Sequence, residues 1–321
     1  QGPMLGAYSR TGCMASFALT ILVPLISVVL KVESQSRELA LLAYPKCGRT
    51  WLTMMLKTVL RGAGAQIDWV NSHGEGVHGH PYLSTAAELE ARFAAFAAAG
   101  SNVSAYFKDA QKTILLLRDP LDVLVSSFHD RKHRGRFNAI GQKGYELPMN
   151  ASLGEYAREL RGGLSSYVAF LNSWVPAALS VPDHVLVVHY EALVQCPMHV
   201  ISHIVNGFLG MNVSCAVLRK AVATNTFQRL QDSSRHSWDP YLAPHDAANP
   251  DSAKFRKGRA HAAHEELSSE AYAVARRTLN ALSPVVREAF YEGTRLCYVL
   301  GSENSVEATG KLRTQDLTCW V

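Results

Sequence analysis

Three short apolar runs, each of strand length, lie at residues 38–44, 112–117 and 184–190. They are continuously apolar rather than alternating, which is typical of strands that are covered on both faces. Residues 50–61 and 165–179, by contrast, carry apolar side chains at helical spacing. Strands that alternate with helices along a chain predict an α/β fold, with a parallel β-sheet flanked by helices.

Capping signals predict where several helices begin. Thr85 is followed three residues later by Glu88, and Ser152 is followed three residues later by Glu155. Both pairs have the spacing of a capping box. Asp119 is followed by Pro120, as expected for an N-cap residue and the first residue of a helix.

The loop after the first predicted strand reads "YPKCGRTW", residues 44–51. A loop that leaves a parallel strand and enters a helix directs backbone N–H groups and the positive end of the helix dipole at one place. Gly48 allows a ligand to approach the backbone, and Lys46 adds a positive charge, so the loop favours a phosphate-like anion. The alternative is a plain strand-to-helix turn with a surface lysine. The spacing differs from that of a Walker loop, which disfavours a kinase or NTPase.

Five segments occur in the order found in the sulfotransferase family. "YPKCGRTW" resembles the family's 5′-phosphosulfate loop, and "RDPLDVLVS" (118–126) resembles its 3′-phosphate motif. "HYEAL" (189–193) and "NTFQRL" (225–230) are similar to a strand end and an adenine-contacting segment, and "FRKG" (255–258) to the late loop. The resemblance implies a P-loop-like sulfotransferase fold. It also implies 3′-phosphoadenosine 5′-phosphosulfate (PAPS) as co-substrate, with no metal expected.

The resemblance also implies the roles of individual residues. Lys46 would act catalytically, donating to the bridging oxygen of PAPS as that oxygen becomes anionic. Trp51 and Phe227 would flank the adenine. The 3′-phosphate would contact Arg118, Ser126, Arg256, Lys257 and Gly258, with Tyr190 nearby, and the 5′-phosphosulfate would contact Lys46, Cys47, Gly48, Arg49 and Thr50.

The chain departs from the family pattern at four positions. Cys47 replaces a serine, so a weak thiol donor stands where a hydroxyl would be. Arg49 replaces a threonine and adds a charge. The family's second late-loop glycine and the lysine after it fall on His261 and His264.

A general base for the acceptor is predicted in "NSHGEGVHGH" (71–80), which follows a weaker strand signal at residues 66–70. Histidine suits this task near neutral pH. The segment resembles the S/T-H-x-G segment of bacterial-type family members, which points to His73, with His78 and His80 as alternatives. Three histidines this close together would also fit a metal site, or simply a solvated loop.

Charge gives weaker signals. The net charge of +5 suits an anionic ligand, but it is too small to indicate nucleic acid. We interpret the basic run "RKHRGR" (131–136) as a solvated helix end, and His129 and His133 as surface residues beside it. Residues 233–260 are predicted to be a long surface loop, and such loops are often functional.

The first residues bear on processing and compartment. Residues 1–3 are similar to the remnant of a cleaved tag. Within the N-terminal segment 4–35, residues 14–30 are seventeen residues without a charge, which favours a signal anchor. The expected location is then the Golgi or secretory membrane, with the catalytic domain in the lumen. The alternative is a buried helix or strand of a cytoplasmic protein.

Other features fit this compartment without requiring it. Asn102, Asn150 and Asn212 begin Asn-X-Ser sequons, as in a glycoprotein. The six cysteines neither require nor exclude disulfides. We place the sulfotransferase domain at residues 36–300 and a tail at 301–321.

The sequence leaves the acceptor open between a glycan and a small molecule, and it does not predict an oligomeric state. Two rival functions remain at this point. One is a nucleotide kinase or NTPase-like protein with a phosphate loop. The other is a non-catalytic PAPS-binding protein, in which the departures have disabled the site.

Overall fold

The computed structural model describes residues 37–65, 67–72, 85–98, 112–134, 146–239 and 241–290, all within one compact unit. Several predictions concern residues outside these ranges. They include the anchor at 14–30, the sequon at Asn102 and the three loop histidines His73, His78 and His80. No helix in the described part of the chain is long and apolar enough to cross a membrane.

The described strands form one four-stranded parallel sheet in the order β2-β1-β3-β4. The side chains of residues 39–43 and 113–117, in the two central strands, are almost fully buried, as their continuous apolar sequences predicted. The α/β class with a parallel sheet is therefore confirmed. The strands are β1 (Arg37–Ala43), β2 (Ile67–Ser72), β3 (Lys112–Leu117) and β4 (Val185–His189).

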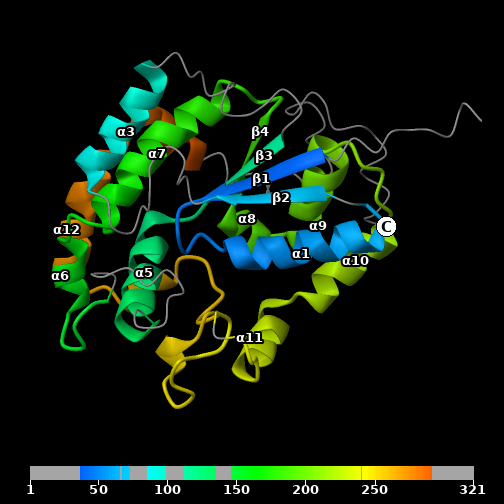
Figure 1. The fold of residues 1–321 in the computed structure, drawn as a ribbon. Coiled ribbons are helices and arrows are strands. Elements are labelled where there is room, and N and C mark those ends of the chain that lie inside the picture. The colour runs from blue at the N-terminus through cyan, green and yellow to red at the C-terminus, as the bar shows by residue number, and fades with distance from the viewer. Residues whose placement is uncertain are drawn as a thin grey trace, which may run out of the picture. The chain divides into compact units, whose positions relative to one another are not determined.

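Helices cover both faces of this sheet. Figure 1 shows α3 and α7 on one side and α1 with α10 on the other. Trp174 and Phe170 of α7 and Met55 of α1 are buried in the same apolar core as the central strands. The helices and helical turns are α1 (Arg49–Gly62), α3 (Ala86–Ala98), α5 (Pro120–Arg134), α6 (Leu153–Ala157), α7 (Leu164–Leu179), α8 (Tyr190–Gln195), α9 (Pro197–Ser202), η2 (His203–Phe208), α10 (Cys215–Thr224), α11 (Phe227–Arg235), η3 (Pro250–Ser252), η4 (Ala262–Glu265) and α12 (Ser269–Leu279).

The predicted helix starts are confirmed. The carboxylate of Asp119 accepts hydrogen bonds of 2.9 and 3.0 Å from two N–H groups in the first turn of α5, and Pro120 is the first residue of that helix. The capping boxes that begin at Thr85 and Ser152 both form reciprocally.

The strand order fixes where a ligand can bind. From β1 the chain crosses to β2 on one side, and β3 and β4 then build the sheet on the other. In such a sheet the loops that leave the two strands at the reversal diverge and leave a crevice at their carboxyl ends. Here these are the loop after β1, residues 44–48, and the residues after β3, 118–119.

The basic run at the end of α5 is not a solvated helix end, so that prediction is wrong. Arg131 is only 2% exposed and Arg134 only 6%. The guanidinium of Arg134 donates to three carbonyl groups, of Tyr241, Ala243 and Ser252, at 2.8–2.9 Å. Arg134 therefore fastens the long segment before the late loop to α5, because a guanidinium has enough donors to satisfy several carbonyls at once.

We expect Arg134→Met to lower the free energy of unfolding by roughly 3–5 kcal/mol, because it strips a buried network of its cation and leaves carbonyls without donors. Chemical denaturation followed by circular dichroism would measure this. Arg158→Ala is the control, since Arg158 is half exposed in a surface pair with Glu270. Equal stability of the two variants would contradict the anchoring role of Arg134.

Candidate active site

A cavity of about 420 Å³ lies beside the loops after β1 and β3. Its walls come from the loop after β1, the start of α1, α5, the first residue of α8, α11 and the late segment 251–263. Of the residues predicted to bind the co-substrate, those lining it are Lys46, Gly48, Arg49, Thr50, Trp51, Arg118, Ser126, Tyr190, Phe227, Arg256, Lys257 and Gly258.

The loop after β1 turns through two left-handed residues, Lys46 (φ 72°) and Gly48 (φ 92°). A side chain at position 48 would meet the ring of Tyr190 at 2.5 Å, so the close approach requires glycine. The first turn of α1 contains no acidic residue. The positive end of this helix is therefore not compensated by a local carboxylate, which favours an anionic ligand.

Lys46 is held at the cavity by Asp130 of α5, with 2.8 Å between Nζ and Oδ1. Burial lowers the pKa of Lys46 to about 8, although the Asp130 carboxylate opposes the shift. At neutral pH the ammonium group remains largely protonated. It can therefore donate to an anion from a fixed position.

Arg118 connects the two loops. Its Nη1 donates to the carbonyl oxygen of Lys46 at 2.9 Å, and its guanidinium lies over the ring of Tyr190, 4.3 Å from the centroid. Nη2 is 3.6 Å from the carboxylate of Asp122. The residue expected at the 3′-phosphate is thus also a structural link to the residue expected at the 5′ end.

Aromatic side chains form one wall. The ring of Trp51 lies edge-on to those of Tyr190 and Phe227, with centroids 5.8 and 6.1 Å apart. Its Nε1 donates to the carbonyl of Asn225 at 2.7 Å, which fixes the indole. Gly258 has φ 62°, and a Cβ there would come within 2.3 Å of Phe227, so the late loop packs directly on this wall.

Cys47 lies outside the cavity, in contrast to its neighbours in the loop. Its thiol is fully buried in the core and 3.5 Å from the hydroxyl of Tyr167. Burial raises the pKa of Cys47 to about 12, so the group stays a neutral thiol. The side chain at this position supports the loop from behind, and its weak donor does not face a ligand.

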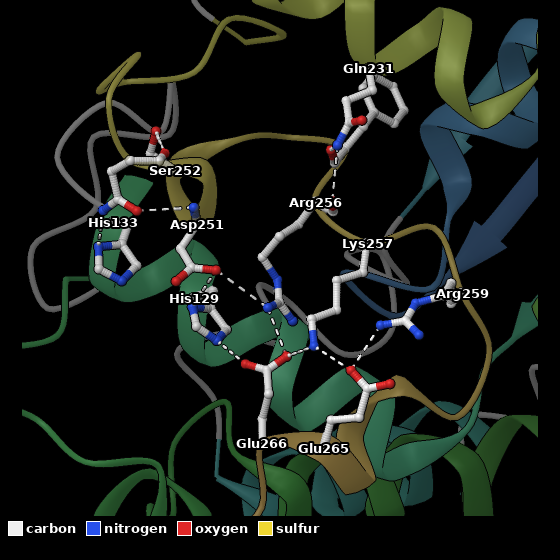
Figure 2. Close-up of polar contacts among 12 residues, drawn as sticks. His129, His133, Gln231, Asp251, Ser252, Arg256, Lys257, Arg259, Glu265 and Glu266 are labelled. Atoms are coloured by element: carbon white, nitrogen blue, oxygen red, sulfur yellow. Dashed lines mark hydrogen bonds and ion pairs between the residues drawn. The ribbon is translucent and has the colours of Figure 1, made fainter.

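Arg256 and Lys257 enter the cavity as part of a charge network (Figure 2). Arg256 Nη1 is 2.7 Å from Glu266 and 3.4 Å from Asp251, and Lys257 Nζ is 2.8 Å from Glu266 and 3.0 Å from Glu265. Burial would raise the pKa of Glu266, but its hydrogen bonds to Lys257 and Arg256 outweigh this and lower it to about 2. The basic pair is therefore already partly neutralised, and an added phosphate would share it with carboxylates.

A model of the sulfotransferase domain matches residues 36–282, about three quarters of the chain. The chain belongs to the sulfotransferase family. This sulfotransferase is accordingly a transferase of sulfonyl groups, as its ordered motifs predicted.

One solved structure supports the fold, and two further ones are similar at lower scores. The crystal structure of mouse sulfotransferase SULT7A1 complexed with PAP is similar, with a TM-score of 0.52 and 16% identity over 80% of this chain and 89% of that chain. Retinol dehydratase in complex with androsterone and the inactive cofactor PAP has a TM-score of 0.46 and 14% identity over 87% of this chain and 83% of that chain. A complex of retinol dehydratase with retinol and PAP has a TM-score of 0.48 and 16% identity over 77% of this chain and 82% of that chain. A search of curated proteins by sequence gives no match.

The late loop of this sulfotransferase is held in place despite its departures from the family pattern. Asp122 accepts hydrogen bonds from the backbone N–H groups of His261 and Ala263, at 2.8 and 2.9 Å. His261 has φ 57°, a left-handed conformation that a glycine would adopt more easily. The histidine therefore adopts a backbone conformation that suits the glycine expected at this position, at a cost of roughly 1–2 kcal/mol.

His129 is not a simple surface residue, so that interpretation is wrong for it. The side chain of His129 is only 12% exposed and lines the cavity, and its Nε2 is 2.6 Å from Glu266. Burial and the nearby Arg256 lower the pKa of His129 in spite of that carboxylate. The ring of His133 stacks on it with 5.8 Å between centroids.

Tyr241 and Lys254 are cavity residues that sequence reasoning missed. The hydroxyl of Tyr241 is 3.5 Å from Thr50 Oγ1, and Lys254 Nζ is 3.9 Å from the centroid of the Tyr241 ring. Burial raises the pKa of Tyr241, but Lys254, the hydrogen bond with Thr50 and Arg49 outweigh it and lower the pKa to about 7. Both residues lie in the segment 233–260, which was predicted to be a long surface loop of a kind that is often functional. No motif within that segment pointed to Tyr241 or Lys254 in particular.

We expect Tyr241 to ionise with a midpoint near pH 7, visible as a tyrosinate step in the near-ultraviolet absorbance. The step should vanish in Tyr241→Phe and move to higher pH in Lys254→Gln, because the ammonium group stabilises the phenolate. Tyr272→Phe, on α12, is the control and should leave the step in place. A step that persists in Tyr241→Phe would assign it to another tyrosine.

Proposed function

We propose that this sulfotransferase takes PAPS as its co-substrate and moves the sulfonyl group to a hydroxyl or amine of a glycan or small-molecule acceptor. The observation that carries the proposal is a single cavity that combines an uncompensated helix N-terminus, a fixed lysine, an aromatic wall and a basic late loop. Such a cavity suits an adenine nucleotide with anionic groups at both ends.

The nucleotide would lie with its 5′ end at the loop after β1. Lys46 and the N–H groups at the start of α1 would hold the phosphosulfate there. The adenine would contact Trp51 and Phe227. The 3′-phosphate would meet Arg118, Ser126 and the pair formed by Arg256 and Lys257, because forked guanidinium groups match phosphate oxygens.

The transfer would be an in-line displacement at sulfur. The acceptor oxygen or nitrogen forms a bond to sulfur while the bond from sulfur to the bridging oxygen breaks, leaving 3′,5′-adenosine diphosphate. Negative charge then develops on the 5′-phosphate, where Lys46 can donate a hydrogen bond that strengthens in the transition state. The acceptor's proton passes to a general base.

We propose His73 as that base, with His78 and His80 as alternatives. β2 ends at Ser72, which pairs with Leu42 in the parallel strand β1. The chain therefore leaves β2 at the same edge of the sheet as the Lys46 loop. Tyr241 is a further alternative among the described residues, because its hydroxyl is at the cavity wall beside Thr50 and its pKa is near neutral.

We propose that the catalytic domain works in the secretory lumen, anchored through residues 14–30. Cys196 and Cys215 are both disulfide-bonded, and disulfides persist in oxidising compartments. The sequon residues Asn150 and Asn212 are both exposed and so accessible to glycosylation. A lumenal location favours a glycan as the acceptor.

Of the two rivals, a non-catalytic protein is disfavoured by the late loop, which keeps its anchoring through Asp122 despite His261 and His264. An NTPase is disfavoured by the spacing of the loop, in which Lys46 precedes Gly48. Binding of ATP–Mg²⁺ more tightly than PAPS would revive the NTPase.

Substitutions at the two linked basic residues should separate catalysis from binding. Lys46→Ala should mainly lower turnover, whereas Arg118→Ala should weaken binding of 3′,5′-adenosine diphosphate by roughly 2–4 kcal/mol, about 30- to 1000-fold. Calorimetric titration and transfer of labelled sulfonyl from PAPS to pooled glycans and small alcohols would measure both. Lys57→Ala, on the exposed side of α1, is the control. Unchanged affinity in Arg118→Ala would exclude its nucleotide role.

The base can be identified by comparing single variants. We expect His73→Ala to reduce turnover by roughly 10²–10⁴-fold with near-normal affinity for 3′,5′-adenosine diphosphate. Activity of the native enzyme should rise from pH 5.5 to 7.5 as the imidazole, near pKa 6.5 if unperturbed, becomes neutral. His78→Ala, His80→Ala and Tyr241→Phe are measured alongside. Full turnover in His73→Ala and collapse in one of the others would move the assignment to that residue.

The location is tested by expressing the full chain in a eukaryotic cell. The protein should resist carbonate extraction and gain electrophoretic mobility on glycosidase treatment, because an anchored lumenal domain is glycosylated. Asn150→Gln and Asn212→Gln should each remove part of that shift if the site is used. Recovery in the soluble fraction with no shift would indicate the cytoplasm.

A further inference from the structure

Two histidines and an aspartate meet at the cavity, and none of the three is assigned to the nucleotide or to the transfer step. His129 and His133 are one turn apart on α5, and Asp251 faces them from η3. One potential ligand atom from each lies within 4.8 Å of the other two. Figure 2 shows the three side chains gathered at this place, with Glu266 reaching His129 as well.

The hydrogen bonding of His129 is incomplete at this point. Its Nδ1 is buried and has no hydrogen-bond partner in the structure. The nearest carboxylate oxygen, Oδ1 of Asp251, is 3.6 Å away, which is too long for a hydrogen bond. A buried imidazole nitrogen that faces a carboxylate oxygen across a gap leaves room for a small cation between them, since both atoms can donate a lone pair.

We propose that His129, His133 and Asp251 bind a divalent transition metal ion of the Zn²⁺ type. Imidazole nitrogen and carboxylate oxygen are ordinary zinc ligands, at about 2.0–2.2 Å from the ion. Ligand atoms in such a tetrahedron are about 3.4 Å apart. The His129–Asp251 separation already has this size, and the remaining atom needs to approach by at most about 1.4 Å.

The surroundings favour His129 as a ligand more than His133. Glu266 contacts Nε2 of His129 at 2.6 Å, and a carboxylate acceptor on the far nitrogen orients a metal-binding imidazole and raises its basicity. The side-chain amide nitrogen of Asn249, which can only donate, is 3.3 Å from Nδ1 of His133. Binding of the ion through Nε2 of His133 therefore requires the proton to move to Nδ1 and this contact to be given up, which weakens the site.

Arg256 is the main opposing group. Its Nη1 is 3.4 Å from Asp251, so it competes for the same carboxylate, but its shorter contact of 2.7 Å is with Glu266. Its positive charge would make this site weaker than an all-protein structural zinc site. Three protein ligands leave a fourth position for water, as in zinc sites that remain open.

A bound ion would have a structural consequence for the cavity. His129 and Asp251 both line it, and they belong to α5 and to the segment that precedes the late loop. The ion would therefore clip this segment to α5, beside the carbonyl contacts that Arg134 already makes. This role is independent of the transfer chemistry, which uses other residues.

The test is calorimetric titration of the full chain with ZnCl₂ at neutral pH, without nucleotide. His133→Gln and Asp251→Asn should each weaken the site at least 100-fold, and Glu266→Gln should weaken it by roughly 10- to 100-fold. His236→Gln is the control, because His236 is exposed and its Nδ1 contacts only the backbone carbonyl of Asp232 among the hydrogen bonds of the described residues. Binding that is equal in the native chain and all four variants would overturn the proposal.

A spectroscopic measurement guards against variants that fail to fold. Co²⁺ in place of Zn²⁺ should give visible absorption bands typical of a four-coordinate ion with nitrogen ligands, in the native chain and in His236→Gln. The bands should be lost in His133→Gln whose far-ultraviolet circular dichroism matches the native chain. A native chain with no such bands would overturn the proposal by itself.

Discussion

The site depends on the guanidinium group of Arg118. Arg118 directly follows the last residue of β3. Its guanidinium donates to the carbonyl of Lys46 in the loop after β1, and it stacks on the ring of Tyr190, directly after β4. It also faces Asp122, whose carboxylate holds the backbone of the late loop at His261. Three segments far apart in the sequence are thus joined through one side chain and its partner, so the two ends of the cavity are positioned relative to each other.

Charge around the cavity is balanced in pairs. Lys46 forms an ion pair with Asp130, and Glu266 forms ion pairs with both Arg256 and Lys257. Such pairing limits the desolvation cost of burying cations, and it holds long side chains in fixed rotamers before a ligand arrives. The carboxylates also reduce the gain when a phosphate binds, so the geometry of the cavity, and not its net charge, must provide much of the selectivity.

Local sequence determined a large part of this fold. The apolar runs predicted β1, β3 and β4 to within a residue or two, because a doubly covered strand needs an apolar side chain at nearly every position. Asp119 and the capping boxes marked helix starts, since a cap acts within one turn. The family resemblance of the ordered motifs also named twelve of the residues that line the cavity, and Cys47 is the one predicted co-substrate residue that does not line it.

Only the tertiary structure decided what depends on contacts between distant segments. No local pattern predicted that Arg134 is buried, because the carbonyls to which it donates lie more than a hundred residues later. For the same reason, the sequence did not predict that Tyr241 lines the cavity or that His129 lies close to Asp251. A side chain's pKa, exposure and partners are set by neighbours in space, whereas strand and helix patterns are set by neighbours in the chain. The sequence therefore determined the elements and the family, and the packing of the late segment against α5 decided the chemistry of the cavity wall.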